Sequence, residues 1–143
     1  SIRYISVLAS LLIALLLITP SVSSDSDCAW HGTASVCLPD ECSEGTTEIA
    51  RAAAIVTKYA DNPFAAFGEI CNFYTKKRLC CTNSVVKLDP KKNCALCDSC
   101  KECPSGQVEL FRPQHGHLWN WRISPFCCNK GTLDVQINDW GRK

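Results

Sequence analysis

The pattern of apolar and polar positions begins with one long apolar run. Tyr4–Ile18 is almost continuously apolar, follows Arg3, and is succeeded by small residues at 21–24. This order is typical of a secretory signal peptide, with cleavage expected after Ser24. A transmembrane anchor is the alternative, but it needs about 20 apolar residues and this run is shorter. We therefore expect a secreted, extracellular protein. Residues 1–24 are expected to be removed as the signal peptide, which leaves no stable membrane anchor.

Beyond residue 24 the pattern is one of short segments that occur twice. A shift of 61 positions aligns Glu41–Arg51 (ECSEGTTEIAR) with Glu102–Arg112 (ECPSGQVELFR), so that Glu, Cys, Gly, Glu and Arg coincide. Each copy later ends in two adjacent cysteines. We expect two related cysteine-rich modules, 25–83 and 84–143, joined through a polar, proline-containing segment.

The repeat also bears on secondary structure. Thr47–Asp61 alone looks helical, because a threonine cap precedes an alanine-rich run that Pro63 would end. The aligned segment of the second copy contains Pro113, and proline removes a backbone donor and clashes with the preceding helical turn. A shared fold therefore favours a strand at Glu48–Arg51, with the alanine-rich tail as an inserted loop or a short helix.

Cysteine content predicts the fold class. All twelve cysteines lie in the 119 residues after the expected signal. A chain this short has a small core, and an oxidising compartment allows disulfides to stabilise it. The even count predicts six disulfides and no free thiol. We expect a small, disulfide-rich, mainly β protein with a framework of Cys28, Cys37, Cys42, Cys71, Cys80, Cys81, Cys94, Cys97, Cys100, Cys103, Cys127 and Cys128.

The adjacent cysteines predict how the closing strands are fastened. These strands are expected at Lys77–Cys81 and Ser124–Cys128, each ending in its cysteine pair. Neighbouring cysteines rarely bond each other, and on a strand they point to opposite faces. Each pair should therefore link its strand to elements on both sides of a small sheet.

Charge and residue chemistry exclude several functions. After residue 24 the chain has fourteen basic and fourteen acidic residues, so a nucleic-acid partner or a strongly cationic, membrane-disrupting action is not expected. Acidic residues are scattered, and Glu48 and Glu109 are repeat positions that would face solvent or an arginine. His31 is expected in a structural turn, and oxidised cysteines supply no nucleophile. No catalytic residue, and hence no enzyme activity, is expected.

One cysteine run suggests a metal. Cys94–Pro104 holds four cysteines, each separated by two residues, and nearly matches a bacterial ferredoxin run, while His115 and His117 could add zinc ligands. A secreted chain favours disulfides at these cysteines instead. We expect no metal and no cofactor.

Aromatic residues supply the candidate binding site. Trp119 and Trp121 alternate, so on a strand they share one face, where their rings could stack on sugar rings. Trp30 is a third candidate. The alternative is that these rings form the small core between the disulfides.

The first module carries a recognisable order of residues: Cys28, Trp30, Gly32-Thr33-Ala34, Cys37, Cys42, Gly45, Glu48, Cys71 and Cys80-Cys81. This order resembles the cysteine-rich module of secreted fungal proteins, which in killer-toxin-like chitinases lies beside the catalytic domain. Ser35 replaces the proline of that pattern, Trp119 stands where Cys71 would repeat, and the Asp-x-x-Asp-x-Asp-x-Glu run of the catalytic domain does not occur. The resemblance implies a secreted accessory module, not hydrolysis.

The six cysteines of the first module also resemble those of β-defensins in order. That resemblance implies the pairs Cys28–Cys80, Cys37–Cys71 and Cys42–Cys81. The expected function is a non-enzymatic extracellular module that binds cell-wall polysaccharide or an extracellular protein. The alternatives are a defensin-like or killer-toxin-like antimicrobial or effector protein, and an enzyme inhibitor that presents the loop Ala60–Gly68.

Overall fold

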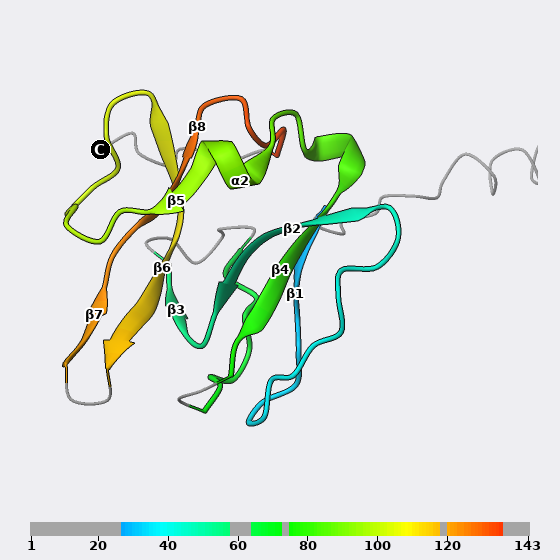
Figure 1. Ribbon diagram of the computed structural model, residues 1–143, viewed down its shortest axis with the longest axis vertical. Coiled ribbons are helices and arrows are strands. Elements are labelled where there is room, and N and C mark those ends of the chain that lie inside the picture. Colours follow the sequence, from blue (N-terminus) through cyan, green and yellow to red (C-terminus); the bar gives the residue numbers. More distant parts are fainter. Residues whose placement is uncertain (1–26, 58–63, 73–74, 118–119, 136–143) are drawn as a thin grey trace, which may run out of the picture.

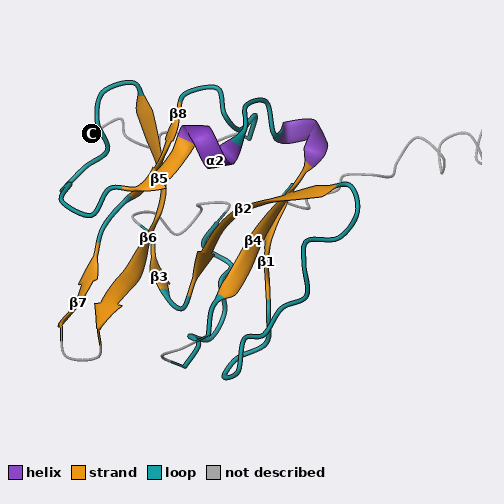
Figure 2. Cartoon of the chain, in the orientation of Figure 1, coloured by secondary structure: helices purple, strands orange, loops and turns teal. Residues whose placement is uncertain are grey.

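The computed structural model describes residues 27–57, 64–72, 75–117 and 120–135. These residues form two antiparallel β-sheets joined by a connection that contains two short helical turns (Figures 1 and 2). The chain is therefore small, disulfide-rich and mainly β, as its sequence predicts. The expected signal peptide lies outside the described residues.

The first sheet has three strands in the order β1-β4-β2. They are β1 (Cys28–His31), β2 (Thr46–Ala52) and β4 (Lys77–Thr82). The strand expected at Glu48–Arg51 is confirmed, and so is the closing strand that ends in adjacent cysteines. As far as residue 57, the alanine-rich tail after β2 bends and forms the two-residue strand β3 (Ile55–Val56). The part of the tail at 58–61 lies outside the described residues.

The second sheet has the order β3-β6-β8-β5, with β7 pairing to β6. Its own strands are β5 (Cys94–Leu96), β6 (Gln107–His117), β7 (Asn120–Ile123) and β8 (Phe126–Asn129). The helical turns are η1 (Asn83–Val85) and α2 (Pro90–Asn93), which follow each other in the connection from β4 to β5. Because β3 pairs with β6, a strand from the first half of the chain completes the second sheet.

The sequence repeat is a repeat of structure. Cys28 pairs with Cys81 across β1 and β4, and Cys94 pairs with Cys128 across β5 and β8 in the same register. The pairing of β2 shifts register just after Glu48, and the pairing of β6 shifts just after the aligned Glu109. Strands β1, β2 and β4 therefore correspond to β5, β6 and β8.

All twelve cysteines are paired, which confirms the expected count of six disulfides. The pairs are Cys28–Cys81, Cys37–Cys71, Cys42–Cys80, Cys94–Cys128, Cys97–Cys100 and Cys103–Cys127. As expected, neither pair of adjacent cysteines bonds internally. Each pair fastens its strand to a neighbouring strand through one residue and to a loop through the other.

The pairing implied by the β-defensin order is right for Cys37–Cys71 and wrong for the other two bonds. Cys28 lies directly opposite Cys81, with the Cα atoms 3.9 Å apart, so these two side chains share one face of the sheet. Cys80 faces the other way and bonds Cys42 in the loop before β2. Neighbouring residues of a strand point to opposite faces, so the strand register decides which cysteine bonds which partner.

One core lies between the two sheets. The Trp30 ring packs edge-on against Phe67 and Phe111, with ring centroids 4.9 and 5.1 Å away. Phe111 stacks in turn on Phe126 of β8. Aromatic side chains from both halves of the repeat therefore form a continuous cluster, with fully buried Leu79 and Leu110 in the same core.

Candidate functional site

The β6–β7 hairpin presents the most exposed tryptophan among the described residues. In Figure 1 it extends away from the remainder of the second sheet. Trp121 is 56% exposed and Ile123 is 40% exposed, and both point to the same face of β7 because they are two residues apart. Gln114 and Gly116 of β6 lie directly opposite them. The hairpin thus has one face that carries an indole ring in contact with solvent.

Gly116 allows this hairpin to close. Its φ is +110°, and a Cβ atom built at this position would lie 2.6 Å from the backbone oxygen of Asn120. An L side chain would therefore meet both an unfavourable backbone conformation and a clash with a rigid group. Glycine at this position therefore permits the close approach of β6 to β7 beside Trp121.

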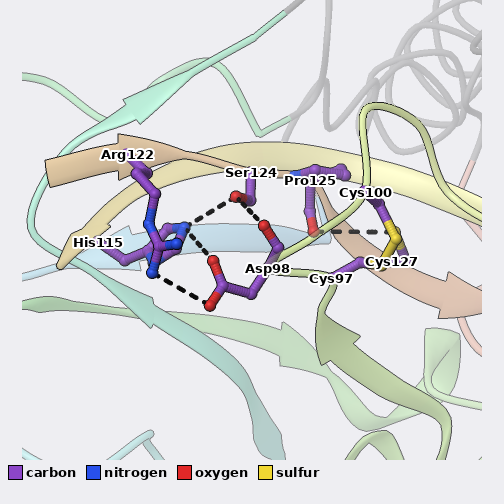
Figure 3. Close-up of polar contacts among 8 residues, drawn as sticks. All are labelled: Cys97, Asp98, Cys100, His115, Arg122, Ser124, Pro125 and Cys127. Carbon is purple, nitrogen blue, oxygen red and sulfur yellow. Dashed lines mark hydrogen bonds and ion pairs between the residues drawn. A yellow bond between two sulfur atoms is a disulfide. The ribbon is translucent and has the colours of Figure 1, made fainter.

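The opposite face of the hairpin is polar and fastened to the loop between Cys97 and Cys100 (Figure 3). The Asp98 carboxylate lies 3.2 Å from Nη2 of Arg122 and 3.5 Å from Nε2 of His115. The backbone oxygen of Asp98 accepts a hydrogen bond from Ser124 Oγ at 3.1 Å. His115 Nε2 is 2.9 Å from the same hydroxyl. Asp98 therefore holds both strands of the hairpin at its base.

This group contains serine, histidine and aspartate, but its geometry is structural. Ser124 is 3% exposed and donates its proton to a backbone carbonyl, so His115 Nε2 is the donor to the hydroxyl and not its base. In a catalytic triad the two histidine nitrogens face serine and aspartate separately, whereas here one nitrogen faces both. The group ties both strands of the hairpin to the loop between Cys97 and Cys100.

Two further features complete the base of the hairpin. The backbone N–H of Cys97 donates to Pro125 O at 2.9 Å, which ties the Cys97–Cys100 loop to the segment before β8. Cys127 Sγ lies 3.8 Å from the same oxygen. That sulfur is bonded to Cys103 and has no proton to donate, so the approach is a packing contact.

Of the other two tryptophans proposed from the sequence, the structure describes Trp30 alone, and Trp30 is not on this face. Trp30 is half-buried in the shared core, and its Nε1 donates to Phe64 O at 2.9 Å. Trp119 lies outside the described residues. The structure therefore makes Trp121 the residue on which a binding site can be argued.

The cysteine run between Cys94 and Cys103 has no thiol left for a metal, because every member is in a disulfide. Within the ranges that the structure describes, no group of three or more His, Cys, Asp or Glu side chains is placed to hold a metal ion. The cysteine sulfur atoms that suggested a metal cluster are bonded to one another in disulfides.

A second exposed surface was not anticipated from the sequence. Val36, Leu38 and Ile70 are 52%, 75% and 65% exposed, and they flank the Cys37–Cys71 disulfide on two loops. Beside them lies a depression of about 620 Å³ lined by the turn at His31 and by the loop that follows it. Apolar residues next to cysteines in loops are the signal in the sequence that could have indicated this surface.

Comparison with protein-family models, with curated proteins and with solved structures finds no match to this chain. No helix in the described part of the chain is both long enough and apolar enough to cross a membrane.

Proposed function

We propose that this chain is a secreted, non-enzymatic module that binds an extracellular polysaccharide through the Trp121 face of the β6–β7 hairpin. The observation that carries this proposal is the 56% exposure of Trp121 on a strand whose base is fastened by Asp98. A large aromatic ring usually gains free energy by being buried, so an indole held in contact with solvent is available to a ligand.

The chemistry of the face suits a sugar ring. An indole presents a flat apolar surface, and the C–H face of a pyranose can stack on it without losing the hydration of its hydroxyls. Gln114 lies directly opposite Ile123 on the same face of the hairpin, and its amide group can donate and accept hydrogen bonds at the edge of a stacked sugar. An apolar contact with a few polar groups beside it is the usual composition of a small-ligand site.

The size of the face favours a polymer over a single sugar or a protein. One indole and Ile123 supply much less than the ~800 Å² that each partner contributes to a stable protein interface. A single contact of this size is weak. An insoluble polymer presents the same sugar many times, so even weak single contacts give retention when binding is multivalent.

Secretion and the absence of catalysis are part of the same proposal. Six disulfides fit an oxidising, extracellular environment. The apolar run at Tyr4–Ile18 is the sequence feature that favours export. The hydrogen-bond directions at Ser124 argue against a serine nucleophile.

Retention on insoluble chitin and on insoluble β-glucan tests the proposal. The purified oxidised protein should be retained by at least one of the two polymers. Trp121→Ala should weaken retention about tenfold or more, because the stacking surface is lost. Trp121→Phe should keep part of the affinity, since a smaller ring still stacks.

Leu38→Ser is the matched control, because Leu38 is also an exposed apolar side chain but lies on the loop beside Cys37. This variant should bind like the parent protein. Retention that is lost with Leu38→Ser and kept with Trp121→Ala would place the binding surface on the loops and contradict the proposal. A parent protein that neither polymer retains would contradict it as well.

A further inference from the structure

The Cys97–Cys100 disulfide differs from the other five in what it connects. The others join residues 24 to 53 positions apart, whereas Cys97 and Cys100 are three positions apart. In the first module the third disulfide joins two loops through Cys37 and Cys71. The second module has Trp119 where Cys71 would repeat. Cys97 therefore bonds within its own loop and fastens no distant part of the fold.

This disulfide also differs in access to solvent. Each of the other five has at least one cysteine that is 3% exposed or less, whereas Cys97 and Cys100 are both half-buried. Thiol–disulfide exchange requires a thiolate to approach a sulfur atom along the S–S bond, so access governs where it occurs. Cys97–Cys100 is the bond that an external thiol reaches most easily.

The loop closed by this bond positions the hairpin. Asp98 lies between the two cysteines, and its carboxylate and backbone oxygen hold Arg122, His115 and Ser124 (Figure 3). The polar face of the hairpin therefore depends on the conformation of a four-residue loop whose ends are joined by the disulfide. A change in that bond reaches the strand that carries Trp121.

We infer that Cys97–Cys100 is a reactive disulfide that exchanges with external dithiols while the other five bonds stay oxidised, and that its opening loosens the β6–β7 hairpin. A thiolate of the dithiol attacks one sulfur, the Cys97–Cys100 bond breaks, and the released thiolate takes up a proton. The second thiol of the reagent then attacks the mixed disulfide. The reagent leaves as a cyclic disulfide, two electrons having passed to the protein, which now has two thiols.

The fold should survive this reduction. Disulfides stabilise a protein largely by restricting its unfolded chain, and the effect grows with the length of the closed loop. In that model each disulfide multiplies the folding equilibrium constant by a factor that depends on sequence separation. The factor for Cys37–Cys71, with a separation of 34, is about 40 times larger than the factor for a separation of three. Opening Cys97–Cys100 therefore costs the fold least.

Graded reduction tests the reactivity. The folded oxidised protein is treated with increasing dithiothreitol, its free thiols are alkylated, and tryptic peptides are mapped by mass spectrometry. Cleavage after Lys92 and Lys101 places Cys94, Cys97 and Cys100 on one peptide. Cys97 and Cys100 should be alkylated first, while Cys94 stays bonded to Cys128. Alkylation of Cys97 and Cys100 together with other cysteines, or after them, would overturn the inference.

Amide hydrogen exchange tests the coupling to the hairpin. At the dithiothreitol concentration that opens Cys97–Cys100 alone, exchange in 114–117 and 120–123 should rise about tenfold or more, while β1, β2 and β4 stay protected. Unchanged exchange in the hairpin would show that the disulfide does not position it. Neither measurement uses a polysaccharide, so failure of the proposed binding function leaves both outcomes unchanged.

Variants separate the disulfide from the ion pairs. Cys97→Ser with Cys100→Ser should raise hairpin exchange without any reductant, whereas the matched pair Cys37→Ser with Cys71→Ser should raise exchange in its own loops. Asp98→Asn should raise hairpin exchange while leaving the reactivity of Cys97–Cys100 unchanged. If the hairpin stays protected both in the Cys97→Ser, Cys100→Ser variant and in Asp98→Asn, the coupling is overturned. Where a variant fails to fold, the reduction experiment on the parent protein still tests the inference.

Discussion

Glu48 and Glu109 occupy the same position of the repeat but differ in the number of ion pairs that each forms. The Glu48 carboxylate forms ion pairs with Arg51 and with Arg78, and its hydrogen bond and charge raise the pKa of the Arg51 guanidinium. Within the part of the chain that the structure describes, Glu109 forms an ion pair with Arg112 alone. Both glutamates therefore face arginine, one of the two roles expected from the sequence, and both lie where the strand pairing shifts register.

Glu48→Gln should destabilise the protein more than Glu109→Gln. The Arg78 side chain is only 12% exposed, and without the Glu48 charge its remaining partner in the described structure is Asp40 O at 2.9 Å. We expect a loss of about 1–2 kcal/mol for Glu48→Gln and about 0.5–1 kcal/mol for Glu109→Gln. Scanning calorimetry at low salt, with disulfides intact, measures both. A larger loss for Glu109→Gln would contradict this ranking.

Gly116→Ala should open the hairpin locally. Its φ of +110° and the 2.6 Å approach to Asn120 O would both oppose a methyl group. Gly131→Ala is the matched control, because Gly131 also has a positive φ but no atom lies within 4 Å of its built Cβ. Hydrogen exchange in 114–117 and 120–123 should rise strongly in Gly116→Ala and stay near the parent value in Gly131→Ala. Equal protection in both variants would show that the close approach is unimportant.

At the scale of elements, the sequence predicts the strands better than it predicts their connections. Pro113 in one copy favours a strand over a helix in the other, and the structure confirms this strand as β2. The pairing of Cys28 could not be deduced, because adjacent Cys80 and Cys81 are equivalent in sequence and differ only in the face that each presents. That choice depends on the register of β1 against β4, which is set by the packed sheet.

The hairpin is the element that the repeat did not predict. The segment that aligns with the Cys71 loop of the first module instead extends β6 and turns back as β7. Two differences in sequence accompany this change: Trp119 stands where the cysteine aligned with Cys71 would repeat, and Gly116 permits the close approach of the two strands. The candidate binding face therefore arises where the second copy departs from the first.

At the scale of the whole molecule, the two halves of the repeat share their core. β3 comes from the first half of the chain and pairs with β6, and Trp30 of β1 packs against Phe111 of β6. Neither sheet alone encloses these rings. A chain of this size that divided its core between two independent units would bury too little apolar surface in each. The halves should therefore unfold together.

Phe111→Ala tests that cooperation. Phe111 is 1% exposed and contacts both Trp30 from the first sheet and Phe126 from the second. Truncation should cost about 3–5 kcal/mol, because it leaves a cavity where the two sheets meet. Calorimetry should show one transition at a lower midpoint, with equal calorimetric and van't Hoff enthalpies. Leu96→Ala, at an exposed position of the second sheet, should change the midpoint little. Two separate transitions, of which only one moves in Phe111→Ala, would mean that each half of the repeat folds on its own core.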